Sequence, residues 1–373
     1  MTAPMPERRV TWAELFFDLV FVFAVTEVAA LLHAEQTGLG LARAVVVFVP
    51  IYWTWVGATM RVNIIGAERA GTQMWLFVVA FCGLLMALAV PDAYHSRALL
   101  FAFAYWAART VLLLTMPKHG RLHWHPYTVS VFGTGPLLVL GAALPPTPQL
   151  AVWALAAVID LSTPTVLRSR LRGMQFAPAH LAERFGLFLL IALGESVVAV
   201  GAPAAAASSI DVDVLLAVAA AFGFTAGLWW VYFHFAADAM RYALSVAQVQ
   251  LDIARHVLSY GHLMFIAAVI SVGVGMREVV GHPADQLSWS VVALLFGGCA
   301  WYLATFSYTR WEMFRKISWT RLAGAGAVLV ALPAAPFLPG WVALAVLALI
   351  VAALNVWEAT RVRAAAAAAA AAG

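Results

Sequence analysis

Charged residues are scarce in this sequence. They make up 11% of its 373 residues, whereas soluble domains carry about 25%. Hydrophobic residues reach 64%, and the mean hydropathy is +0.89. Such a composition excludes both a soluble globular protein and a disordered chain. Cysteine is also rare, and because Cys82 and Cys299 each lie inside an apolar stretch, a structural disulfide is not expected. The sequence is that of an integral membrane protein.

We expect no transmembrane span before residue 12 or after residue 358. A cleavable signal peptide is not expected, because the segment before the first apolar stretch is short and Glu14 and Asp18 interrupt that stretch. At the other end, residues 364–373 are alanines followed by one glycine. We interpret this segment as an Ala-rich tail or linker.

The apolar stretches have the length that crosses a bilayer. A helix rises ~1.5 Å per residue, so about 20 residues span the ~30 Å hydrocarbon core. We therefore predict an all-α integral membrane protein with about twelve transmembrane helices. The expected spans are residues 12–32, 41–62, 72–90, 97–116, 127–144, 149–167, 182–203, 212–235, 253–276, 288–309, 319–335 and 340–358.

The basic residues predict how these spans are oriented. We assign all but three of the 22 Lys and Arg residues to one side of the membrane, where they lie before the first span, after the last one, or in alternate connections and the span ends next to them. The exceptions are Arg43, Arg97 and Arg277. By the positive-inside rule, both termini are expected in the cytoplasm of a bacterium, with the helices in its inner membrane. This topology accounts for the net charge of +4, so a nucleic-acid partner is not expected.

The first span contains three carboxylates: Glu14, Asp18 and Glu27. Carboxylates in lipid are costly and normally face a protein interior or a water-filled cavity. Thr11 and Glu14 have the spacing of a capping box, which would place Glu14 at the membrane surface. Asp18 lies one turn deeper, as either a structural or a functional group. Glu27 has no capping role and is therefore the strongest functional candidate of the three.

The sequence also predicts an internal repeat. Glu14 and Glu27 in the first span have counterparts in Glu183 and Glu195 of the seventh, 13 and 12 residues apart. Because each half would hold six spans, the predicted repeats are parallel and related by a pseudo-two-fold axis along the membrane normal. In such folds the site lies between the repeats. Glu27 and Glu195 are then expected to face one internal cavity, where at least one exchanges protons.

The predicted boundaries follow from this repeat. The first six-helix repeat is expected over residues 1–172 and the second over residues 173–363.

Four stretches carry a family resemblance. They are ELFFDLVFVFAVTEV at Glu14–Val28, ERFGLFLLIALGESVVAVG at Glu183–Gly201, WWVYF at Trp229–Phe233, and Tyr260-Gly-His262. Together they resemble the bacterial low temperature requirement A (LtrA) family of integral membrane proteins. The resemblance implies a link to cold or stress tolerance, which the family's name records, but no molecular activity. It also leads us to expect an acidic residue at position 234, where this chain has His234.

Further polar residues near or within the spans are candidates for a proton relay. His234, Asp238 and Arg241 are spaced to form one helical stripe at the end of the eighth span. A His beside a carboxylate is suited to proton transfer, and an interfacial ion-pair network is the alternative. His262 lies in an apolar run. It is either part of a proton relay or a structural residue held by a hydrogen bond. Asp160 precedes Pro164, where a proline can unwind a helix.

The segment HGRLHWH gives a weak candidate for a metal site, with His119, His123 and His125 as ligands. The alternative is a loop at the lipid headgroups, because the segment is basic and contains Trp124. No cofactor is expected.

The sequence thus favours a proton- or cation-coupled transporter of unknown substrate. The alternatives are a cation or proton channel, a membrane enzyme acting on a lipid-soluble substrate, and a purely structural role in stress tolerance. The expected partners are the lipid bilayer and an unidentified small molecule or ion, with homo-oligomerisation left open.

Overall fold

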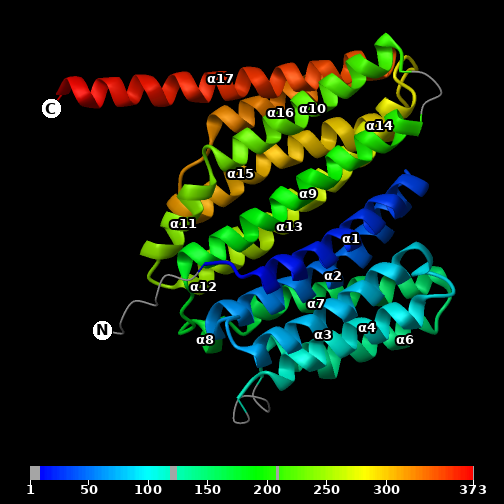
Figure 1. The fold of residues 1–373 in the computed structure, drawn as a ribbon, viewed down its shortest axis with the longest axis vertical. Helices are drawn as coiled ribbons and strands as arrows, with labels where there is room; N and C mark the ends of the chain where they lie inside the picture. Colours follow the sequence, from blue (N-terminus) through cyan, green and yellow to red (C-terminus); the bar gives the residue numbers. More distant parts are fainter. Residues whose placement is uncertain (1–8, 118–123, 207–209, 373) are drawn as a thin grey trace. The chain divides into compact units, whose positions relative to one another are not determined.

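The computed structural model describes residues 9–117, 124–206 and 210–372, and the secondary structure of these residues is helical (Figure 1). The all-α prediction is therefore confirmed. Ten helical segments of the described chain are long and apolar enough to span a membrane. They are Trp12–Ala34, Gly38–Ile65, Ala70–Asp92, Pro146–Val166, Pro178–Ala206, Val212–Val246, Gln250–Gly281, Trp289–Phe314, Trp319–Phe337 and Gly340–Ala364.

Two shorter apolar helices, Ala98–Leu114 and Pro126–Ala142, occupy the predicted spans 97–116 and 127–144. The first has 17 residues, which extend ~25 Å, a little less than the hydrocarbon core. The structure therefore supports ten spanning helices by length. The count of twelve stays a prediction.

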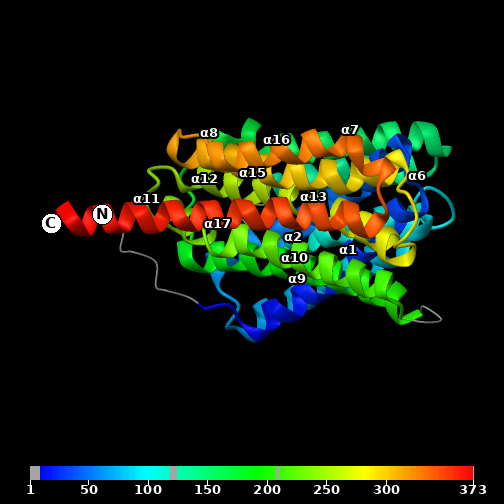
Figure 2. The ribbon, with the colours of Figure 1, turned by 90° about the horizontal axis from the view of Figure 1, so that it is seen from above.

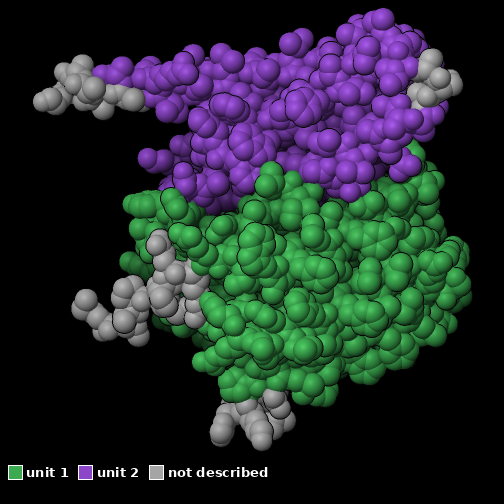
Figure 3. Space-filling view, in the orientation of Figure 1, with its two compact units in different colours: residues 1–191, 241–263 green, residues 192–240, 264–373 purple. Residues whose placement is uncertain are grey.

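The chain divides into two compact units (Figure 3). Unit 1 comprises residues 1–191 and 241–263, and unit 2 comprises residues 192–240 and 264–373. This division differs from the predicted repeats because α9 and the helix that ends in α13 each contribute residues to both units. The repeat itself stays a prediction.

Unit 1 is built from helices joined by short connections. In it α1 packs against α2 and α3, α3 packs against α4, and α6 packs against α4 and α7. Its elements, with α9 and α11 completing it, are α1 (Trp12–Ala34), α2 (Gly38–Ile65), α3 (Ala70–Ala89), η1 (Val90–Asp92), α4 (Ala98–Leu114), α5 (Pro126–Val129), η3 (Ser130–Thr134), α6 (Gly135–Ala142), α7 (Pro146–Val166), α8 (Arg168–Leu171), α9 (Pro178–Ala206), α11 (Ala237–Val246), α12 (Gln250–Ile253) and η4 (Ala254–Tyr260).

Unit 2 contains the remaining helices. In it α10 packs along α17 (Figure 2), and α16 packs against both α15 and α17. Its elements are α10 (Val212–Phe233), α13 (Gly261–Gly281), α14 (Trp289–Val292), η5 (Ala293–Gly297), α15 (Gly298–Phe314), α16 (Trp319–Ala331), η6 (Leu332–Phe337) and α17 (Gly340–Ala372). The Ala-rich tail continues α17, because alanine is the best helix former.

Among the described residues, three helices contain a π-helical segment: η3, η4 and η5. A π-segment inserts an extra residue into the helical turn and is frequent at functional sites. The segment η3 provides two hydroxyl groups of the site described below. By contrast, Pro164 does not unwind α7, which continues through it to Val166.

The predicted stripe of His234, Asp238 and Arg241 on one helix is wrong. The α10 helix ends at Phe233, and α11 begins at Ala237 after a turn. In α11 the side chains of Asp238 and Arg241 are exposed and that of Met240 is buried.

Candidate functional site

The first candidate site lies in unit 1, where α1 meets the beginning of α9. It consists of Glu14, Asp18, His180 and Arg184, which we call the α1–α9 cluster. Each of the four is at most 2% exposed. The capping box predicted for α1 is confirmed, because Thr11 and Glu14 exchange hydrogen bonds. It does not place Glu14 at the surface, however, since the same carboxylate reaches the buried cluster.

Arg184 holds the cluster together. Its Nη1 donates to Asp18 Oδ2 at 2.5 Å and to the backbone carbonyl of Glu14 at 2.9 Å. Its Nε lies 3.6 Å from Glu14 Oε1. On the other side of the Asp18 carboxylate, Trp55 Nε1 donates to Oδ1 at 2.7 Å. Asp18 is thus bound by a guanidinium and an indole, the arrangement that a carboxylate needs away from water.

His180 links Glu14 to α2. Its Nε2 lies 3.0 Å from Glu14 Oε1. Its Nδ1 is 2.9 Å from Asn63 Nδ2, and the Asn63 carbonyl oxygen accepts a bond from the Ala177 backbone N–H. Because the Asn63 amide donates to Nδ1, the ring proton of a neutral His180 sits on Nε2 and faces Glu14.

The charges of the α1–α9 cluster do not balance without a proton. Two carboxylates face one guanidinium, and the neutral form of His180 adds no charge. An uncompensated buried charge is unfavourable, so a proton bound to the cluster lowers the cost of its excess negative charge. This arrangement can bind and release a proton inside a spanning helix pair.

A second buried carboxylate, Asp160 on α7, lies in unit 1. The hydroxyls of Ser130 and Thr134 donate to Asp160 Oδ1 at 2.9 Å and 3.1 Å, and Tyr105 donates to its other oxygen. Ser130 and Thr134 are four residues apart and bound the π-segment η3, which brings both to the same carboxylate. Asp160 was predicted as a site residue from its place in an apolar span.

Arg109 extends the network of Asp160. Its Nη2 donates to Ser130 Oγ at 2.8 Å, and its Nη1 donates to the Trp53 carbonyl at 3.1 Å. Gly57 makes room for this approach, because a Cβ at that position would lie 2.6 Å from Arg109 Nη1. A continuous set of hydrogen bonds therefore runs from Arg109 through Ser130 to Asp160.

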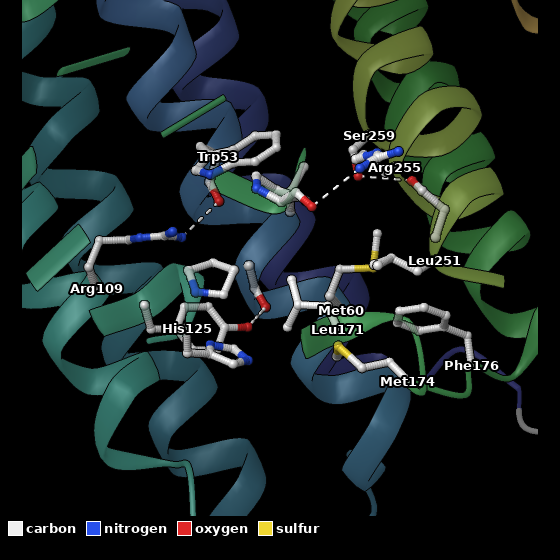
Figure 4. A pocket seen from close by; sticks show the side chains of 16 residues that line it. Trp53, Met60, Arg109, His125, Leu171, Met174, Phe176, Leu251, Arg255 and Ser259 are labelled. Atoms are coloured by element: carbon white, nitrogen blue, oxygen red, sulfur yellow. Dashed lines mark hydrogen bonds between the residues drawn. The ribbon is translucent and has the colours of Figure 1, made fainter. Parts of the chain in front are cut away.

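Beside Arg109 lies a pocket of unit 1 with a cavity volume of about 80 Å³ (Figure 4). Figure 4 shows Arg109 and His125 on one side of it and Arg255 on the other, with Met60 and Leu171 between them. Since a water occupies about 30 Å³ of the liquid, the pocket has room for a few waters or a small solute.

Arg255 belongs to an ion-pair network of unit 1. Its Nη2 lies 3.2 Å from Asp252 Oδ1, and Arg168 binds the same carboxylate through Nε at 2.7 Å. The network fastens α12 and η4 to α8.

The carboxylates predicted as a functional pair are less buried than these groups. Glu27 and Glu195 are half-buried, and Arg97 acts electrostatically on Glu27. Glu183 is exposed, although its proposed counterpart Glu14 is buried, because the neighbouring Arg184 turns inward instead.

The predicted histidines also have separate environments. His234 is exposed and packs against the ring of Trp230. His262 is fully buried, with its Nδ1 3.2 Å from the Val257 carbonyl, as expected for a hydrogen-bonded structural residue. His119 and His123 lie outside the described residues, and within those residues no group of three or more His, Cys, Asp or Glu side chains is placed to hold a metal ion.

Sequence reasoning missed the buried arginines and their partners. Arg109, Arg184 and Arg255 were counted among the basic residues of the cytoplasmic connections, because each lies near the end of a span. The available signal was their position next to apolar residues, as in Arg184-Phe-Gly-Leu-Phe. His180 carried no such signal, because it lies outside the expected span.

Comparison with known proteins agrees with the composition and the helical fold. The family described as "Bacterial low temperature requirement A protein (LtrA)" matches residues 9–356. An uncharacterized protein of Rhizobium meliloti (strain 1021) is 26% identical over 370 residues, which cover 94% of this chain and 89% of that protein. No solved structure matches the chain.

Proposed function

This chain belongs to the bacterial LtrA family of membrane proteins, and we propose that it is a proton-coupled transporter. The observation that carries the proposal is the charge balance of the α1–α9 cluster. Two buried carboxylates against one arginine need a proton within spanning helices. Ionisable residues at such positions mark proton relays and substrate pathways in membrane proteins.

The Asp160 network supplies the second element of the mechanism. A solute in the pocket touches Arg109, and Arg109 is connected through Ser130 to Asp160. A change of charge in the pocket therefore acts on a buried carboxylate across two hydrogen bonds. Binding of the solute and the protonation of Asp160 are linked by this path, which is the requirement for coupled transport.

Glu27 and Glu195 remain part of the proposal as a second pair of carboxylates. They are half-buried and belong to the helices that carry the α1–α9 cluster. We place them in the pathway toward the side of the membrane opposite the cluster, because they lie in the later halves of α1 and α9. This assignment rests on the predicted parallel repeat of residues 1–172 and 173–363.

The topology proposed with this function has twelve spans and both termini in the cytoplasm of a bacterial inner-membrane protein. A reporter that is active only in the periplasm, fused after Arg363, is expected to be inactive. Activity of that fusion would contradict the orientation, whereas the same reporter fused after Arg97 should be active.

The function is tested by reconstitution. Purified protein in liposomes that contain a pH-sensitive dye is given an inward gradient of Na⁺, K⁺ or ethanesulfonate, a small anion that crosses lipid slowly. A transporter moves protons at a rate that saturates with one of these solutes and vanishes in liposomes without protein. A flux that is ohmic in voltage and does not saturate would favour a channel, and no flux with any driving solute would contradict the proposal.

The variants Glu14→Gln, Asp18→Asn, Asp160→Asn, Glu27→Gln and Glu195→Gln separate the roles. Each keeps the shape of the side chain and removes its charge change. We expect the first three to lose proton coupling. If Glu27→Gln and Glu195→Gln keep full rate and full pH dependence, those two carboxylates are structural.

A further inference from the structure

The pocket of unit 1 is lined by apolar side chains and by two arginines. Trp53, Met60, Leu171, Met174 and Phe176 provide apolar surface. Among the described lining residues the charged ones are Arg109 and Arg255, and neither a glutamate nor an aspartate reaches the lining. The pocket therefore offers positive charge and apolar contact to whatever enters it.

Each of the two arginines has a donor left over. Arg109 is 1% exposed and Arg255 is 6% exposed, yet the Nε–H group of each has no hydrogen-bond partner in the protein. Their terminal nitrogens are already used, by Trp53 and Ser130 for Arg109 and by Pro164 and Asp252 for Arg255. Buried guanidinium donors without acceptors are rare, and an anion satisfies them best.

The charge at the pocket is positive, which favours an anion. Asp160 is already bound by three hydroxyls, and Asp252 is shared between Arg168 and Arg255. Burial, and then the positive charges of Arg109 and Arg61, lower the pKa of His125 to about 4. His125 is thus neutral at neutral pH, and its buried Nδ1 also lacks a partner in the protein.

We infer that this pocket binds a small organic monoanion, a carboxylate or sulfonate with a short apolar portion, between Arg109 and Arg255. The anionic group accepts from an unpaired arginine Nε–H donor at one side of the pocket, and the apolar portion contacts the methionine, leucine and phenylalanine side chains between the two arginines. The volume of about 80 Å³ limits the ligand to a few heavy atoms. The inference deepens the proposed transport function, on which it rests for the anion being the transported solute.

Binding is measured on the full chain in detergent by isothermal titration calorimetry, with propionate and ethanesulfonate as probes. Propionamide, which has the same shape without the charge, is the control ligand. We expect both anions to bind and propionamide not to bind. If propionamide binds as well as propionate, the arginines do not select the ligand and the inference is wrong.

Protein variants locate the site. Arg255→Lys keeps the charge and removes the Nε–H donor, so propionate affinity is expected to fall about tenfold or more. Arg109→Gln removes both charge and donor and should weaken binding further. Arg172→Gln is the control, because Arg172 is exposed and belongs to the same basic region. Equal affinities in Arg255→Lys, Arg172→Gln and the unmodified protein would overturn the assignment.

Two further experiments are needed. The first distinguishes a soluble anion from a lipid headgroup, and the second distinguishes failure of anion binding from failure of the transport function. Inorganic phosphate and detergent micelles doped with phosphatidylglycerol are titrated in the same way. Competition by the lipid but not by soluble anions would show a headgroup site and contradict the small-solute inference. Binding without proton flux in liposomes would contradict the transport function alone, whereas saturable flux with Na⁺ or K⁺ but no anion binding would contradict this inference alone.

Discussion

The two units of this chain bury different kinds of side chain. Among the described residues, Arg321 is the buried charged residue of unit 2, and it pairs with Glu358 of α17 at 3.0 Å. Its neighbours in the core are aromatic, with Tyr232, Phe265 and Phe306 in mutual contact. Unit 1 instead buries charged residues on α1, α4, α7, α9 and η4, namely Glu14, Asp18, Arg109, Asp160, Arg184 and Arg255.

This difference indicates which unit contains the proposed functional residues. Helices in lipid associate mainly through van der Waals packing, which the apolar side chains of both units provide. Buried ion pairs give at best a small net gain in stability, because the desolvation of the charges offsets their attraction. The charged residues of unit 1 therefore add little net stability over an apolar interior, which agrees with the functional role that we propose for them. Unit 2 has the interior expected of a supporting scaffold.

The largest effect is expected from Arg184→Met in unit 1. It leaves two carboxylates buried without their cation, which costs about 3–5 kcal/mol of folding free energy. We expect a large drop in the melting temperature in detergent, or no folded protein by size-exclusion chromatography. Glu183→Gln, at the exposed neighbouring position, should melt like the unmodified protein. Similar melting of both variants would show that the α1–α9 cluster is not buried as described.

The next effect concerns acid stability. The pKa of His125 is about 4 in the folded protein and about 6.5 when unfolded. The unfolded chain therefore binds the proton more strongly, and stability is lost as the pH falls from about 6.5 to about 4, by at most about 3 kcal/mol. His125→Gln should remove this part of the acid destabilisation. A melting temperature with the same pH dependence in both proteins would contradict it.

Two buried tyrosines, one in each unit, allow the same substitution to be compared between the units. Tyr105 in unit 1 donates to the Asp160 carboxylate, whereas Tyr302 in unit 2 donates to the Leu228 carbonyl at 3.0 Å. A bond to a charged group is worth about 1.5–3 kcal/mol, and a neutral one about 0.5–1.5 kcal/mol. Tyr105→Phe should therefore destabilise more than Tyr302→Phe in thermal melts. The reverse order would break the comparison.

The smallest effect is expected at the exposed ion pair of unit 1. Arg168 and Asp252 are 49% and 30% exposed in their side chains, so water and salt screen their attraction. Asp252→Asn should change the melting temperature slightly at low salt and not at all in molar salt. A large, salt-independent change would mean that Asp252 belongs to the buried networks.

The sequence was sufficient for the fold class and for part of the site. Hydropathy located ten helices, the spacing of Thr11 and Glu14 predicted the capping box, and the burial of Asp18 and Asp160 followed from single carboxylates in apolar runs. The partners could not be predicted, because Trp55, Arg109 and Arg184 meet these carboxylates only through the packing of distant helices. The positive-inside rule also led us to treat Arg109 and Arg184 as exposed, because it assigns a basic residue near the end of a span to the adjoining connection. Glu27 and Glu195 stay predictions.

The central claim is that the buried carboxylates of unit 1 carry the protons. It is tested most directly by measuring the initial proton flux of two matched variants in the same liposome assay, Asp18→Asn in unit 1 and Glu358→Gln in unit 2. Each removes one carboxylate that pairs with an arginine. We predict that Asp18→Asn abolishes coupled flux and that Glu358→Gln keeps the flux of the unmodified protein. Equal fluxes in the two folded variants would contradict the account.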